Sequence, residues 1–271
     1  MQKKEISNNC NKEIVIKTNN SDIFIDGVEL ESNGTIEYDN KYIEVTEQVE
    51  NEQTTISIVQ KEDYKPYGLP VFDSEIEKLH HITNPEIIVK TPYCPENNKI
   101  KIKLNKDNIY RILIKNKYGD ITLKEVGLTH SSIETDTGNI SISSPRQIGE
   151  DTSIDEVATV TGNIGIYYSI GVESVKTITG DIEISVSKDI NHIENEYGST
   201  DIRHTRFTKP DSSIKTGPKG VNIKASYLPE TLSIESDGHV DINSSSIDVD
   251  GIKIKCLSLA FDGRNRVLKN K

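Results

Sequence analysis

Apolar and polar residues alternate along most of this chain with a period of two. The alternation is clearest in three short segments, Ile140-Ser141-Ile142, Ile164-Gly165-Ile166 and Ile182-Glu183-Ile184. A period of two places every second side chain on the same face of a β-strand, so each segment is predicted to be a strand with one buried face. An amphipathic helix would need apolar residues three and four positions apart, and these segments lack that spacing.

A glycine turn precedes each of these strands, and the turns form a repeat. In the clearest copies the sequence is Thr-Gly-Asn/Asp-Ile-x-Ile, and another alternating strand lies before the turn. Spacings of 18 to 24 residues separate the turn glycines, which are Gly119, Gly138, Gly162, Gly180, Gly198, Gly217 and Gly238. A nearly constant period is typical of stacked repeats. Glycine suits a turn with a positive φ angle, and Asn or Asp after it can bond nearby backbone groups.

The repeat predicts an all-β fold, a single-stranded parallel β-solenoid, or β-helix, with coils of 18 to 24 residues. One such coil cannot bury its Ile face alone, but stacked coils bury it in a narrow continuous column. Two inward ladders are expected to form the core, one of Ile140, Ile164 and Ile182, the other of Ile142, Ile166 and Ile184. A sheet of β-hairpins is the alternative, because Gly-Asn and Gly-Asp also suit hairpin turns, but a meander has no reason to keep a constant period.

Four segments are predicted along the chain. Residues 1–60 contain shorter alternating stretches and are expected to form an N-terminal β cap or the first coils. Residues 61–95 hold five of the nine prolines and form an irregular insertion, in which residues 74–77 resemble the capping box of a short helix running to His81. Residues 96–260 are the regular solenoid, and residues 261–271 are a basic tail.

The composition fits a narrow core. Hydrophobic residues make up 34% of the chain, Trp is absent, Met occurs once and Phe four times. No apolar run approaches the ~18–20 residues of a transmembrane helix, so no membrane span is predicted. The polar N-terminus, without an apolar signal region, and three widely spaced cysteines predict a cytoplasmic protein. An extracellular or surface location is expected if the chain was trimmed before this sequence begins.

The repeated turns resemble a family of bacterial adhesin-like proteins known as DUF4097. Ile87-Ile88-Val89-Lys90-Thr91-Pro92 is similar to the strand that leads into the family's repeats, and Tyr118-Gly119-Asp120-Ile121 to the first repeat. The resemblance covers residues 86–255 well and residues 10–60 loosely. It implies a bacterial β-solenoid repeat protein and little about activity. Members of the family often lie outside the cell or on a membrane anchor.

A search for catalytic chemistry identifies no catalytic, cofactor-binding or metal-binding residues. Asp120 and Asp181 occupy the same turn position, but Asn139 and Asn163 lie between them in the repeat, which indicates turn chemistry. The one adjacent histidine pair, His80-His81, would point in different directions on a helix and would not chelate a metal together. Neither a phosphate-binding loop nor a nucleophile-elbow motif occurs. No cofactor and no enzymatic activity are therefore expected, and a β-helix carbohydrate-active enzyme is the third-ranked hypothesis.

Charge varies in bands along a chain whose net charge is −11. Residues 99–124 carry a net charge of +6, residues 133–201 carry −10 and residues 203–224 carry +5. The basic band has few aromatic residues to stack on bases, so nucleic acid is not an expected partner. The first hypothesis is a non-enzymatic, adhesin-like module that presents a repetitive surface to a protein or glycan partner. The alternative is a structural protein that self-associates end to end, as the similar bactofilins do.

Overall fold

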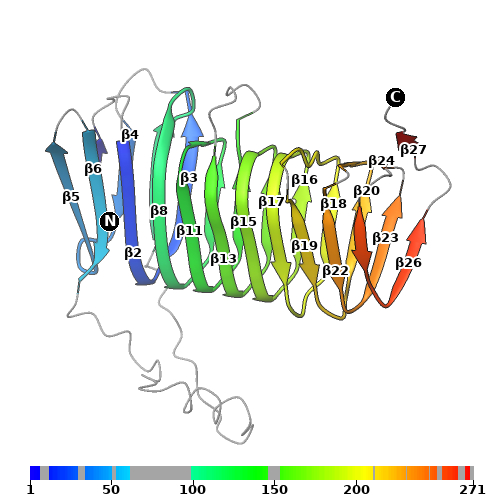
Figure 1. Cartoon of the computed structure of the whole chain (residues 1–271). Helices are drawn as coiled ribbons and strands as arrows, with labels where there is room; N and C mark the ends of the chain where they lie inside the picture. Colours follow the sequence, from blue (N-terminus) through cyan, green and yellow to red (C-terminus); the bar gives the residue numbers. More distant parts are fainter. Residues whose placement is uncertain are drawn as a thin grey trace, which may run out of the picture.

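The chain forms a parallel β-solenoid. The computed structural model describes residues 1–6, 12–29, 34–50, 53–61, 99–145, 153–209, 211–229, 231–243, 245–248, 252–261 and 266–268. Figure 1 shows the coils stacked along one axis, with β5 and β6 near one end and β26 and β27 at the other. The predicted all-β fold of stacked parallel coils is confirmed. The short helix predicted near residues 74–81 lies outside the described residues.

Two long sheets form the faces of the solenoid. In spatial order, sheet A consists of β1 (Gln2–Ile6), β4 (Gly34–Tyr38), β7 (Lys99–Asn105), β3 (Asp22–Val28), β9 (Ile121–Lys124), β12 (Ile140–Ser143), β14 (Ile164–Tyr167), β16 (Ile182–Ser185), β18 (Thr200–Arg203), β20 (Val221–Lys224), β23 (His239–Asn243) and β26 (Ser258–Phe261). Sheet B consists of β5 (Ile43–Glu50), β6 (Gln53–Gln60), β2 (Lys12–Asn20), β8 (Ile109–Tyr118), β11 (Ser131–Thr137), β13 (Ile154–Thr161), β15 (Ile170–Thr179), β17 (Lys188–Asn195), β19 (Ser213–Thr216), β22 (Ser233–Ser236) and β25 (Lys253–Lys255). Shorter strands line a third side, namely β10 (Gly127–Leu128), which pairs with β8, and β21 (Tyr227–Leu228), β24 (Ser246–Asp248) and β27 (Arg266–Leu268).

The N-terminal coils are stacked out of sequence order. β2 pairs in parallel with both β6 and β8, and β3 pairs in parallel with both β7 and β9. The coil of β2 and β3 is therefore inserted between β6–β7 and β8–β9. β1, β4 and β5 cover this end as antiparallel strands. Residues 1–60 thus supply both an antiparallel cap and strands of the parallel stack, and the segment predicted as a basic tail contributes β27, which pairs with β24.

Isoleucine ladders fill the space between the sheets. Ile164 of β14 is in register with Ile140 of β12 and Ile182 of β16, and the side chains of all three are buried. The second ladder, at Ile142, Ile166 and Ile184, is equally buried. Each coil adds one strand per sheet at roughly 4.8 Å, so equivalent side chains stack directly on one another. The column remains narrow, which is why a chain with so few large residues can fill it.

Glycines stack at the corner where the chain passes from sheet B to sheet A, called here the glycine corner. The φ angles are 148° at Gly138 and 153° at both Gly162 and Gly180, a region that favours glycine. Space is equally restrictive, because a Cβ built on Gly162 would lie 2.0 Å from the carbonyl oxygen of Gly138. Gly119 has the same features, with a φ of 127°.

The weaker copies of the turn use glycine differently. Gly198, Gly217 and Gly238 do not share the positive φ, but a Cβ on each would lie within 2.2 Å of a backbone oxygen of the preceding coil. In the copy that contains Gly217, the positive φ falls at Gly220. Close stacking is therefore the requirement common to all seven corner glycines, and the left-handed conformation applies to the clearest copies.

At the corner that follows the sheet A strands, five coils have a residue other than glycine in the left-handed conformation. Its left-handed residues have φ angles of 50° to 58° and are Glu125, Tyr168, Val186, His204 and Ala225. In four of the five copies a buried Ser or Thr follows, and in three of these its hydroxyl donates to the carbonyl oxygen two residues earlier, as Ser187 does to Ser185 at 3.1 Å. This hydroxyl stabilises the turn. Val186, the one β-branched residue among the five, is strained in the left-handed conformation.

Replacing Val186 by asparagine is expected to raise the free energy of unfolding by about 1 kcal/mol, because asparagine tolerates the left-handed region that strains valine. The Val186 side chain is 45% exposed, so little packing is lost. Chemical denaturation of Val186→Asn measures the change. Val160→Asn is the matched control, since Val160 is 46% exposed but lies in a regular strand. An equal gain in both variants would contradict the role of backbone strain.

Candidate functional site

The turn residues examined as catalytic candidates form a structural ladder along the glycine corner. The side-chain oxygen of Asp120 accepts a hydrogen bond from the backbone N–H of Asn139 at 2.7 Å. Asn139 accepts in the same way from Asn163, and Asn163 from Asp181, at 2.9 and 2.8 Å. The ladder satisfies one backbone N–H in each coil, and Asp and Asn serve equally well because both carry an acceptor oxygen. The arrangement explains the alternation of Asp and Asn without a catalytic role.

Asp181 ends this ladder at Ser199. Its Oδ1 accepts from both the backbone N–H and the side-chain hydroxyl of Ser199, each at 2.8 Å. These hydrogen bonds, backbone first, hold the pKa of the Asp181 carboxyl below its usual range, with a smaller contribution from Lys219. A lowered folded-state pKa means that the ionised carboxylate stabilises the fold above its unfolded pKa, and that this contribution is lost as the pH falls through the folded pKa.

Asp181→Asn is expected to keep the stability at pH 7 within about 0.5 kcal/mol, because the amide oxygen replaces the carboxylate as acceptor. Below the unfolded Asp pKa of about 3.9, the variant should lose less stability than the wild type as the pH falls. Asp181→Ala is expected to cost about 0.5–1.5 kcal/mol at pH 7, because it removes the acceptor. Urea denaturation at pH values from 7 to about 3 compares the three proteins. Identical acid dependence of the wild type and Asp181→Asn would contradict the assignment.

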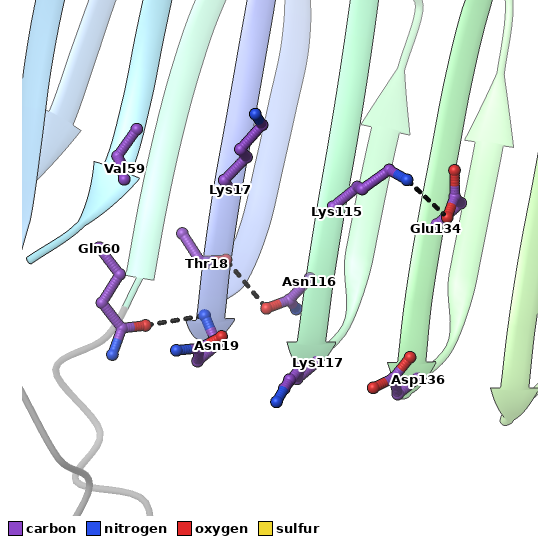
Figure 2. A pocket seen from close by; sticks show the side chains of 10 residues that line it. All are labelled: Lys17, Thr18, Asn19, Val59, Gln60, Lys115, Asn116, Lys117, Glu134 and Asp136. Carbon is purple, nitrogen blue, oxygen red and sulfur yellow. Dashed lines mark hydrogen bonds and ion pairs between the residues drawn. The ribbon is translucent and has the colours of Figure 1, made fainter. Parts of the chain in front are cut away.

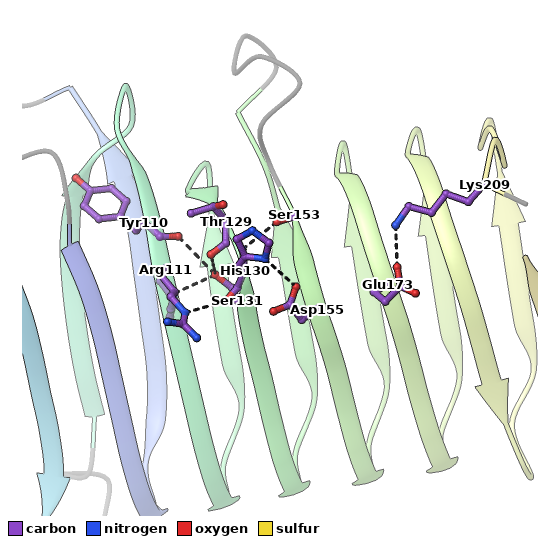
Figure 3. Close-up of polar contacts among 10 residues, drawn as sticks. Tyr110, Arg111, Thr129, His130, Ser131, Ser153, Asp155, Glu173 and Lys209 are labelled. Atoms are coloured by element: carbon purple, nitrogen blue, oxygen red, sulfur yellow. Dashed lines mark hydrogen bonds and ion pairs between the residues drawn. The ribbon is translucent and has the colours of Figure 1, made fainter. Parts of the chain in front are cut away.

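Polar residues near the other end of the sheet B strands form two separate groups, one around His130 and one around Glu173 (Figure 3). Nδ1 of His130 lies 3.4 Å from Asp155, and Nε of Arg111 donates to the backbone oxygen of His130 at 3.3 Å. Lys209 donates to Glu173 at 2.7 Å, and that bond contributes most to holding the pKa of Glu173 below its usual range. Within the described ranges, no group of three or more His, Cys, Asp or Glu side chains could hold a metal ion.

A groove runs across the outward face of sheet B beside the glycine corner, and we call it the sheet B groove. Its basic section is an open hollow of about 400 Å³ (Figure 2). The residues that line it are Lys17, Thr18, Asn19, Val59, Gln60, Lys115, Asn116, Lys117, Glu134 and Asp136. Lys17 and Lys115 occupy directly opposed positions on β2 and β8, and Lys115 pairs with Glu134 at 3.6 Å.

The acidic section of the groove continues along the same face. This second hollow, of about 340 Å³, shares Glu134 and Asp136 with the first and extends to Glu194 and Glu196. Val160 of β13 and Ile178 of β15 lie side by side in it, because the threonines on either side of each are paired in register. Val160 is 46% exposed and Ile178 is 41% exposed. The groove therefore combines lysines at one end, carboxylates at the other and an apolar strip between the carboxylates. Such exposed apolar residues with charged neighbours are typical of interaction surfaces.

Sequence reasoning did not identify the residues that line this groove. The basic band at residues 99–124 contains Lys115 and Lys117, and the acidic band at residues 133–201 contains Glu134 and Glu194. The charge bands were therefore the available signal. Lys17 and Gln60 come from the inserted N-terminal coils, whose position no periodicity in the sequence indicates.

Stacked parallel coils with buried isoleucine ladders define the protein as a β-solenoid repeat protein. The family model described as Toastrack DUF4097 matches residues 11–258, and the chain belongs to this family. The resemblance noted in the repeated turns is thereby confirmed.

A solved structure of a "putative cell adhesion protein" from Clostridium sporogenes ATCC 15579 is similar at 12% identity, covering 94% of this chain and 98% of that chain with a TM-score of 0.30. None of the curated proteins matches the chain. Across the portion of the chain that the structure describes, no helix is long and apolar enough to span a membrane.

Proposed function

We propose that this chain is a non-enzymatic interaction module that presents the outward face of sheet B to a protein or glycan partner. The observation that carries the proposal is the sheet B groove, where Val160 and Ile178 stand exposed among the carboxylates of the acidic section. Strands of adjacent coils hold these side chains at fixed spacing, so little conformational entropy is lost on binding.

The partners of the charged residues outside the groove support a non-enzymatic role. Asp120 and Asp181 accept backbone hydrogen bonds from the next coil, which fixes them in the ladder of the glycine corner. Glu173 accepts from both Lys209 and Asn191, at 2.7 and 2.6 Å. Carboxylates held in this way stabilise the solenoid, and a general acid or base would need a free site for the reacting proton.

Glycan and protein microarrays test the proposal with three forms of the chain. The wild type is expected to bind a defined subset of the arrayed glycans or proteins without cleaving them. The double variant Val160→Asp/Ile178→Asp should lose that binding, because it adds two charges to the apolar strip. Ser141→Asp adds a charge on the outward face of sheet A and should leave binding intact. Equal binding by the two charged variants, or progressive cleavage of a bound glycan, would contradict the proposal.

End-to-end self-association is the second candidate, favoured by the last coil. Leu259 and Phe261 continue the inward ladders of Val240 and Ile242 but remain 43% and 52% exposed. The opposite end carries two charged side chains in inward positions among apolar ones. In strand register, Lys4 lies opposite Ile36 and Glu47 opposite Ile56, and both isoleucines point into the core. Nζ of Lys4 donates to the backbone oxygen of Val45 at 3.3 Å.

These unlike ends argue against an open polymer, because head-to-tail contact would press apolar side chains against charged ones. Inward-pointing charges on edge strands are a known means of preventing such stacking. We therefore expect the molar mass measured by light scattering to stop at two chains as the concentration rises. A mass that grows without limit would contradict this account and favour the polymer.

A further inference from the structure

We propose that the basic section of the sheet B groove binds an acidic sugar of a glycan, with the anionic group, a carboxylate or a phosphate, held among Lys17, Lys115 and Lys117. The inference rests on the proposed function and narrows its partner to one chemical class. Three features of the groove carry it: uncompensated charge, an unused hydrogen-bond donor, and a lining that suits a sugar better than a polypeptide or a nucleic acid.

Positive charge accumulates in this part of the face. Lys17 and Lys115 are directly opposed on neighbouring strands, an arrangement that is destabilising for like charges. Several lysines elsewhere on sheet B pair with carboxylates of adjacent strands, as Lys215 does with Glu194 at 3.5 Å and Lys255 with Glu235 at 2.6 Å. Among the described residues, Lys17 and Lys117 have no ion pair. An anion at this position would relieve the repulsion.

Gln60 adds a hydrogen-bonding group at the edge of the hollow. Its Oε1 accepts from the backbone N–H groups of Asn19 and Asn20 at 2.8 and 3.2 Å, which fixes the side chain (Figure 2). The residue is only 7% exposed, and its Nε2 has no hydrogen-bond partner within the described part of the chain. A buried donor without an acceptor is costly, so an acceptor oxygen that reached Nε2 would lower that cost.

The lining of the hollow selects the class of ligand. Val59 is its one apolar side chain, so the hollow offers no apolar pocket for the aromatic anchors that dominate protein interfaces. It contains no aromatic residue on which a nucleic-acid base could stack. Glu134 and Asp136 border the lysines and would repel the next charge of a long polyanion. The exposed amide of Asn19, the amide of Gln60 and lysines around a short basic stretch instead match one acidic sugar within a glycan.

Isothermal titration calorimetry with three defined probes tests the inference. The probes are the trisaccharide of galacturonic acid, its fully methyl-esterified form and inorganic phosphate. The proteins are the full chain, the double variant Lys17→Gln/Lys117→Gln and the matched control Lys215→Gln. Both substituted groove lysines lack an ion pair among the described residues, so the double variant is expected to fold, which far-UV circular dichroism checks.

The acidic trisaccharide should bind the wild type and the control, and the double variant should bind it at least about tenfold more weakly. The methyl ester should not bind, and a higher salt concentration should lower the affinity for the acidic trisaccharide. Phosphate binding with the same dependence on the lysines would support the site and assign the anionic group to a phosphate. Equal affinity of the double variant and the control, or binding of the ester as tight as that of the acid, would overturn the inference.

Failure of all three probes to bind would also overturn it. The proposed function would survive such a result if the microarrays still showed binding that depends on Val160 and Ile178. If no probe bound and array binding did not depend on Val160 and Ile178 either, the proposed function would be contradicted as well. The two failures are therefore distinguishable.

Discussion

Gly162→Ala is expected to lower the free energy of unfolding by about 2–6 kcal/mol, combining strain at a positive φ with overpacking. The φ of Gly162 is 153°, and a Cβ there would lie 2.0 Å from the carbonyl oxygen of Gly138. The neighbour is backbone of the adjacent coil, and it cannot move without breaking the stack. Because Gly180 stacks on Gly162 in the same way, the disturbance should extend over at least two coils. Denaturant unfolding followed by circular dichroism measures the loss.

Gly165→Ala is the matched control for this prediction. Gly165 lies three residues further on, and the atoms nearest to a Cβ there belong to the phenol group of Tyr167, at 2.9 Å. That ring is the far end of a side chain on the outer face of sheet A, so it can move aside. The control should therefore cost much less than Gly162→Ala. Equal losses at the two positions would contradict the stacking of glycine on backbone as the reason for the turn motif.

Ile164→Ala is expected to cost about 2–5 kcal/mol, the range for large-to-small substitutions in a packed core. Ile164 is buried between Ile140 and Ile182, with coils stacked on both sides. The neighbouring strands are fixed by their backbone hydrogen bonds, so the cavity cannot collapse fully. The loss should appear in the midpoint of denaturant unfolding with little change in its slope.

Ile178→Ala tests the same change of side chain at the surface. Ile178 is 41% exposed on the outward face of sheet B, so its loss should be below about 1 kcal/mol. Comparable losses at Ile164 and Ile178 would contradict the ladder as the source of stability. The comparison also shows whether the apolar strip of the sheet B groove can be altered without unfolding the chain, which the binding experiments require.

The regular part of the fold could be predicted because the repeat carries its own register. A glycine followed two residues later by isoleucine fixes which face turns inward, and the nearly constant spacing places each coil on the last. Ile140, Ile164 and Ile182 are adjacent in space for this reason. The ladder of Asp and Asn side chains at the glycine corner was accessible through the same motif, although hydrogen bonds to the next coil are evident only from the structure.

The N-terminal stack could not be predicted from alternation alone. Alternation defines the two faces of a strand but not its partner, and β2 lies between β6 and β8 although 48 residues, 61–108, separate β6 from β8 in the sequence. Thr18 and Asn116 share a hydrogen bond of 2.9 Å across 98 residues of sequence. The basic section of the groove depends on this pairing, and it was missed for that reason.

Hydroxyl-radical footprinting of the wild type, with and without the array ligand that binds it most tightly, tests the central claim most directly. It reads the solvent exposure of side chains, whereas amide exchange is already slowed throughout a hydrogen-bonded stack. The account predicts protection of Val59, Val160 and Ile178 on sheet B, and unchanged oxidation of Tyr168 at the corner beyond sheet A. Protection confined to Tyr168 and the outward face of sheet A would contradict it.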